Sequence, residues 1–108
     1  MQFSVLLTDD TVRDVESIYD HIDLHHGSAK AGHVLDRIEK ALNGLSENPD
    51  RGAYPEELLA LGLREFCQIF FKPYRMIYRV IENKVYVLLT ADGRRDMQKL
   101  LQRRLLQA

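Results

Sequence analysis

Arginines on and beside the apolar segments of the C-terminal half are the side chains of this sequence best suited to chemistry. Successive side chains of a β-strand point to opposite faces, so in "YRMIYRVI" Arg75 and Arg79 share a face and lie about 13 Å apart. Guanidinium groups bind phosphate or carboxylate in a bidentate manner, so a cluster of them makes an anion site. The alternative is a solvated sheet face on which each arginine pairs with a neighbouring carboxylate. The candidate cluster comprises Arg64, Arg75, Arg79, Arg94 and Arg95.

The charges of the chain are divided unevenly between its two halves. Residues 1–60 carry 5 Lys or Arg and 12 Asp or Glu, a net charge of −7. Residues 61–108 carry 10 Lys or Arg and 4 Asp or Glu, a net charge of +6. A basic face built by the C-terminal half would attract nucleic acid or an acidic protein. The alternative is that the two halves intermix in space and their fields cancel.

A general acid or base to accompany the arginines is harder to find. Two of the histidines, four residues apart, could bind a metal together, but a third ligand at suitable spacing is missing, and we interpret all four as surface residues. Cys67 lies within an apolar run and is interpreted as a small buried hydrophobe. Glycine-rich phosphate loops and a Gly-x-Ser-x-Gly elbow are both absent, so neither a cofactor nor a metal is expected. The histidines are His21, His25, His26 and His33.

The elements that must position these side chains follow from the hydrophobic periodicity. An apolar stripe with a period of 3.6 residues marks two consecutive helices, separated at Gly27-Ser28 and ended by Asn48-Pro49. The later segments are rich in aromatic and β-branched residues and are separated by tight turns, which predicts a three-stranded antiparallel meander. The expected elements are a strand over 2–7, helices over 12–22 and 31–45, strands over 64–71, 74–81 and 85–90, and a helix over 96–106.

This order, β-α-α-β-β-β-α, predicts an α+β fold of one domain over residues 1–108. We expect a small antiparallel sheet with the helices mainly on one face, packed against an antiparallel helical hairpin plus a C-terminal helix. At 108 residues, with 45% hydrophobic and 29% charged residues, the chain suits one soluble globular core. No membrane span or signal peptide is visible, and a single cysteine fits a reducing cytoplasm.

Four short motifs follow one another along the chain. "NPDRGAYPEEL" follows the helical hairpin, "LGLREF" opens the aromatic strands, and "YRMIYRV" and "ADGRRDMQKLL" come after it. In this order and spacing, and with the predicted element order, they resemble the ParE/RelE superfamily of toxins from bacterial type II toxin–antitoxin systems. The resemblance covers nearly the whole chain and implies the fold of that superfamily.

The resemblance implies one of two activities. RelE-like members are ribosome-dependent mRNA endonucleases that hold the scissile phosphate with strand arginines and often transfer protons with a His or Tyr near the C-terminus. ParE-like members inhibit DNA gyrase and lack that acid–base set. The nuclease ending usually reads His-Arg-Arg-x-x-Tyr, whereas this chain has Gly93 and Gln98 at the two titratable positions. Neither is a general acid or base near neutral pH, so the resemblance favours the ParE-like branch.

We therefore expect a non-enzymatic toxin that stabilises gyrase–DNA cleavage complexes, blocks replication and belongs to the class linked to plasmid stabilisation. By the resemblance, a ParD-like antitoxin would cross the hairpin and the sheet and hold the toxin in a hetero-oligomer; direct nucleic-acid binding is not expected. Two alternatives remain: an mRNA interferase that uses the five arginines as a phosphate clamp, and a module that only binds its antitoxin. The expected antitoxin-binding residues are Val15, Ile18, Tyr19, Ile22, Leu35, Arg75, Arg79, Arg94 and Arg95.

Overall fold

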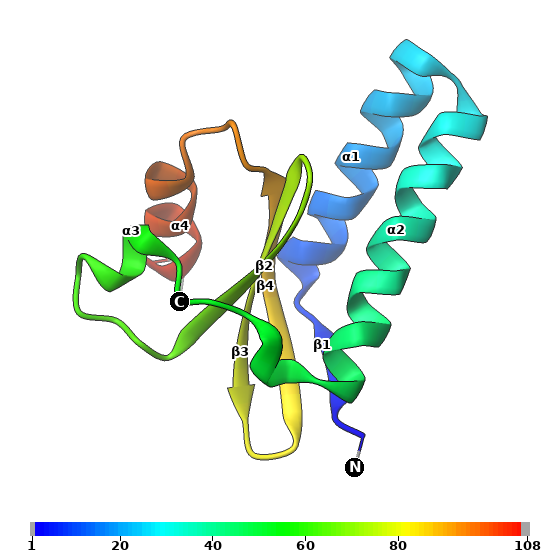
Figure 1. The fold of residues 1–108 in the computed structure, drawn as a ribbon. Helices are drawn as coiled ribbons and strands as arrows, with labels where there is room; N and C mark the ends of the chain where they lie inside the picture. Colours follow the sequence, from blue (N-terminus) through cyan, green and yellow to red (C-terminus); the bar gives the residue numbers. More distant parts are fainter. Residues whose placement is uncertain (1, 107–108) are drawn as a thin grey trace.

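The computed structural model describes residues 2–106 and contains one four-stranded sheet in the order β1-β4-β3-β2 (Figure 1). The three later strands pair antiparallel, which confirms the predicted meander. The first strand pairs parallel with β4, so the sheet is mixed rather than purely antiparallel as expected. The reason is the helical hairpin: it returns the chain to its starting end, and three alternating strands then bring β4 into the direction of β1. The strands are β1 (Ser4–Leu7), β2 (Phe66–Phe71), β3 (Tyr74–Ile81) and β4 (Lys84–Asp92).

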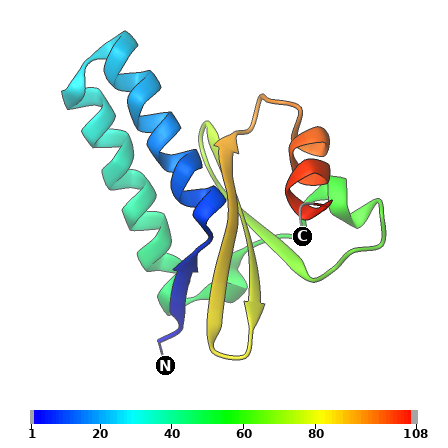
Figure 2. The ribbon, with the colours of Figure 1, turned by 180° about the vertical axis from the view of Figure 1, so that it is seen from behind.

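The helical hairpin forms where the apolar periodicity predicts it. Helix α1 (Asp9–His26) begins after Thr8, whose side-chain oxygen accepts a hydrogen bond from the Thr11 N–H and so caps the helix. Helix α2 (Ser28–Glu47) runs back beside it (Figure 2). The hairpin packs on the sheet through Ile38 and Leu45, both of which are buried.

The helices cover both faces of the sheet, whereas the sequence suggested mainly one. The C-terminal helix α4 (Met97–Leu106) packs on the face opposite the hairpin, together with the short helix α3 (Glu56–Leu59) (Figure 1). A register shift between β3 and β4, at Ile77/Tyr78, changes the face to which the residues of β4 point. Before the shift, Val85 and Val87 of β4 point toward the hairpin. After it, Leu89 and Ala91 point toward α4, so one strand supplies apolar side chains to two cores.

The segment between the hairpin and β2 is irregular, as expected, and carries the 3₁₀ turn η1 (Pro49–Arg51) before α3. It closes over the fully buried Tyr78, whose hydroxyl donates to the Pro49 carbonyl at 2.6 Å. Burial raises the pKa of Tyr78 to about 12, because the phenolate would lose its hydration. Gly52 lies against this ring, and a Cβ there would stand 2.1 Å from the Tyr78 hydroxyl.

Candidate functional site

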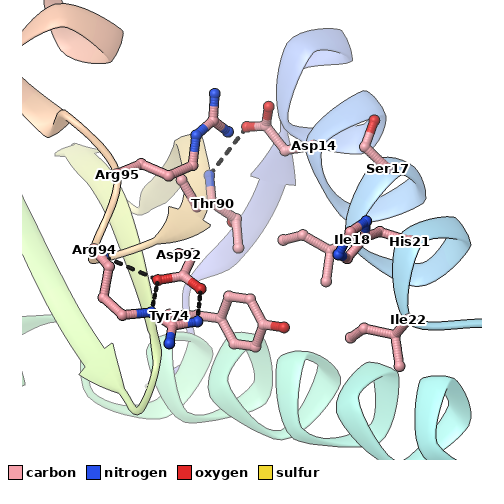
Figure 3. A pocket seen from close by; sticks show the side chains of 11 residues that line it. Asp14, Ser17, Ile18, His21, Ile22, Tyr74, Thr90, Asp92, Arg94 and Arg95 are labelled. Carbon is pink, nitrogen blue, oxygen red and sulfur yellow. Dashed lines mark hydrogen bonds and ion pairs between the residues drawn. The ribbon is translucent and has the colours of Figure 1, made fainter. Parts of the chain in front are cut away.

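A groove of about 500 Å³ lies between α1 and the end of β4 (Figure 3). It exists because β1 ends at Leu7, whereas β4 continues to Asp92, so the last residues of β4 have no strand beside them on that edge. Helix α1 stands next to this open edge. The groove is lined by Asp14, Ser17, Ile18, His21, Ile22, Tyr74, Thr90, Ala91, Asp92, Arg94 and Arg95.

A charged network holds α1, β4 and α4 together at one end of the groove. The Asp14 carboxylate accepts a hydrogen bond from the Thr90 N–H at 3.0 Å, and so satisfies a backbone donor of the open edge (Figure 3). The Arg104 guanidinium, from α4, binds the same carboxylate through two nitrogens at 2.9 Å each and also donates to the Leu88 carbonyl at 2.6 Å. Because both side chains are less than one-fifth exposed, the network fixes the position of the groove wall.

The two arginines at the end of β4 differ in how they are held. Arg94 pairs with Asp92, from its Nε to Oδ1 at 2.9 Å and from its backbone N–H to the same oxygen. This pairing lowers the pKa of Asp92 to about 2, because the guanidinium stabilises the carboxylate. No ion pair within residues 2–106 involves Arg95, which is exposed at the rim of the groove. Arg95 is therefore the cation of this corner best placed to meet an added anion.

The groove also brings in two titratable side chains that the sequence did not connect with the arginines. His21, on α1, and Tyr74, at the start of β3, line the same groove as Arg94 and Arg95. Burial and then the nearby Asp92 carboxylate raise the pKa of Tyr74, since both oppose the phenolate. No periodicity could have revealed this grouping, because it depends on where α1 lies over the sheet.

The strand arginines lie on the other face of the sheet. Arg75 and Arg79 share the face that carries α3 and α4, as the alternation predicts. Arg75 binds Glu57 of α3 through two nitrogens at 2.7 Å each and donates to the Gln68 amide oxygen at 2.7 Å. These hydrogen bonds lower the pKa of Glu57 and raise the pKa of Arg75. The exposed Arg79 guanidinium lies 5.9 Å from the centroid of the Phe66 ring.

The five arginines therefore do not form the single anion cluster that the sequence suggested. Arg94 and Arg95 line the groove, whereas Arg75 and Arg79 lie on the opposite face of the sheet, where Glu57 already neutralises Arg75. Arg64 is exposed and precedes β2 in the chain. Glu57 was missed because it lies in the irregular segment, 18 residues from its partner.

The expected antitoxin-binding set is similarly divided. Ile18 and Ile22 line the groove together with Arg94 and Arg95. Three others are half-buried, with Val15 and Tyr19 packed against the core. The set as a whole comprises Val15, Ile18, Tyr19, Ile22, Leu35, Arg75, Arg79, Arg94 and Arg95, and its role stays a prediction.

Three of the histidines, His21, His25 and His26, lie at the hairpin end of α1, and His33 lies on α2. The ring centroids of His21 and His25 are 4.5 Å apart. Within residues 2–106, no group of three or more His, Cys, Asp or Glu side chains is placed to hold a metal ion. None of the helices in that range has the length and apolar character needed to cross a membrane.

Comparisons with known proteins agree with this architecture. A family model described as the ParE toxin of the type II toxin–antitoxin system parDE matches residues 5–97. No curated protein sequence matches the chain.

Several solved structures are similar to the chain. One, from the chromosomal ParDE toxin–antitoxin system of P. aeruginosa, is 20% identical with a TM-score of 0.70, covering 84% of this chain and 96% of that one. A chain of the RelBE2 toxin–antitoxin complex from Mycobacterium tuberculosis is 21% identical with a TM-score of 0.58, covering 85% and 99%. A mutant RelE toxin from E. coli in the free state is 15% identical with a TM-score of 0.63, covering 95% and 98%. At these identities the likeness shows the fold.

Proposed function

The chain belongs to the ParE toxin family of type II toxin–antitoxin systems, and from that premise we propose that it inhibits DNA gyrase and is neutralised by a ParD-like antitoxin. The toxin would act by binding in the cytoplasm, without catalysis of its own, and would stabilise gyrase–DNA cleavage complexes that block replication. The observation that carries the proposal is the state of Arg75. Its guanidinium is satisfied by Glu57 and Gln68, so a phosphate would have to displace an existing bidentate ion pair.

The groove between α1 and β4 supports the proposal that an antitoxin binds the chain. Ile18 and Ile22 give it an apolar wall, and Arg95 gives it a cation without a carboxylate partner among the described residues. A segment that carries an aliphatic side chain next to an acidic one would complement both features. We propose that the antitoxin presents such a segment, and that its affinity falls as salt screens the charges.

An antitoxin-binding measurement tests the groove assignment. The variant Arg95→Glu places like charge against the acidic segment and should weaken antitoxin binding by at least roughly tenfold. Arg103→Glu, an exposed arginine of α4 outside the groove, is the matched control and should bind within a factor of about two of the wild type. Equal loss in both variants would mean that net charge, rather than the groove, governs the affinity.

The gyrase assignment is tested separately, with purified gyrase and relaxed plasmid. Toxin alone should inhibit supercoiling, and addition of the antitoxin encoded in the adjacent reading frame should restore it. Undiminished supercoiling at a large excess of folded toxin would contradict the proposal.

The alternative is a ribosome-dependent mRNA endonuclease, and one observation favours it. His21 and Tyr74 line the same groove as Arg94 and Arg95, so titratable groups and cations occur together although the C-terminal His and Tyr of the nuclease pattern are absent. Primer extension on translated mRNA discriminates between the two functions. Codon-dependent cuts that disappear in His21→Ala would favour the nuclease.

A further inference from the structure

A second concavity, of about 300 Å³, lies between α2 and the edge strand β2, away from the groove beside α1. Three basic side chains meet there: Arg37 and Lys40 from α2, and Arg51 from the η1 turn that follows it. The remaining lining residues are Ala41 and Phe71. We call this concavity the basic hollow. Its three basic residues belong to residues 1–60, whose net charge is negative, so the composition gave no sign of it.

The positive charge of the basic hollow is not compensated locally. No carboxylate lines it, and no ion pair within residues 2–106 involves any of its three basic side chains. The contrast with Arg75, Arg94 and Arg104 is clear, because each of those is bound to an aspartate or glutamate. Three like charges around one hollow repel one another and favour an anion between them.

Arg37 is held in place by neighbouring groups, and Arg51 lies close against α2. Arg37 donates to the Lys72 carbonyl at 2.7 Å, and its guanidinium carbon lies 5.9 Å from the centroid of the Phe71 ring. The Nη1 atom of Arg51 lies 2.7 Å from where a Cβ at Gly44 would stand. The guanidinium therefore rests in space that only a glycine leaves open on the last turns of α2. Such positioning reduces the conformational entropy lost when an anion binds.

We propose that the basic hollow binds phosphates of the DNA backbone. Duplex DNA carries one negative charge for about every 1.7 Å of its axis, which suits several closely spaced cations. A docked peptide would instead require apolar anchors, and the lining offers only Ala41 and the half-buried Phe71.

This inference goes beyond the proposed function and differs from the expectation, drawn from the sequence, that the chain does not bind nucleic acid directly. If the chain acts on gyrase, the basic hollow gives it a contact with the DNA that gyrase holds. The two claims fail separately, because DNA binding is measured without gyrase.

The test is fluorescence anisotropy of purified toxin with a short labelled duplex over a series of salt concentrations. The variant Lys40→Gln/Arg51→Gln removes two cations of the basic hollow. The matched control, Lys99→Gln/Arg103→Gln, removes one exposed lysine and one exposed arginine from α4 and leaves the same net charge. Each phosphate contact contributes about 0.9 to the slope of log K against log salt, so the first variant should lower the slope by about 1.8. The control should keep the wild-type slope.

A second variant, Gly44→Ala, moves the Arg51 guanidinium without removing its charge. It should weaken duplex binding while circular dichroism shows the same helix content, which separates site geometry from net charge. Equal slopes for the double variant and its control would overturn the proposal. So would displacement of the duplex by polyglutamate of equal charge at equal concentration, because that result would identify a site for an acidic protein.

Discussion

The ion pair between Arg75 and Glu57 allows the strongest quantitative prediction. The two side chains are 12% and 24% exposed, and Arg75 donates three hydrogen bonds of 2.7 Å to Glu57 and Gln68. Hydrogen bonds to charged groups contribute about 1.5–3 kcal/mol when shielded, and removal of one partner leaves the other unsatisfied. We expect Arg75→Ala to lower the free energy of unfolding by about 2–3 kcal/mol, which in a domain of this size lowers Tm by roughly 8–12 °C.

A double-mutant cycle separates the pair from other effects of the substitutions. Glu57→Ala should cost about 1–2 kcal/mol, because Arg75 keeps Gln68, and the cycle should give a coupling energy of about 1–2 kcal/mol by urea unfolding. Arg79→Ala is the control on the same strand and face. Arg79 is exposed and lies over the Phe66 ring, so its loss should cost less than about 1 kcal/mol. A coupling energy near zero, or equal losses for Arg75 and Arg79, would refute a structural role for Arg75 and leave it free to hold phosphate.

Three further predictions concern single positions. The Asp92 carboxyl should titrate near pH 2 by NMR. Its ion pair with Arg94 therefore persists above that pH and is lost as the pH falls through it. Arg94→Ala should return the pKa of Asp92 toward 3.8. Gly52→Ala should cost about 2–4 kcal/mol in urea unfolding, because the new methyl group displaces the Tyr78 hydroxyl from its buried hydrogen bond. Asp14→Ala should cost about 2–4 kcal/mol and speed hydrogen exchange of the amide to which it is bonded at the open edge of β4.

Most of the elements could be predicted from the sequence, because their signals are local. The apolar stripe of the hairpin and the tight turns of the meander lie within short windows, and both are confirmed. The parallel pairing of β1 with β4 and the placement of α4 could not be predicted in this way. The parallel pairing depends on the hairpin, which returns the chain to the end of the sheet where β1 begins. Which residues of β4 face each core depends on a register shift at Ile77/Tyr78 that no local pattern marks.

The features of the candidate sites that could be predicted are also the local ones. The alternation of β3 correctly places Arg75 and Arg79 on one face, because that relation is internal to a strand. The ion pair of Arg75 and the shared groove of His21 and Arg95 bring together residues that are far apart in the chain. The basic hollow likewise depends on how η1 folds back beside α2. The sequence shows where the arginines are in the chain, but not which side chains lie beside them in the fold.

The central claim, action on gyrase by binding, is tested most directly by a cleavage assay with purified gyrase, supercoiled plasmid and toxin, stopped with detergent and protease. We predict that linear DNA accumulates with increasing toxin and that it still does so with Glu57→Ala, in which Arg75 loses its carboxylate partner. No linear DNA at excess toxin, together with codon-dependent cuts in translated mRNA, would contradict the account.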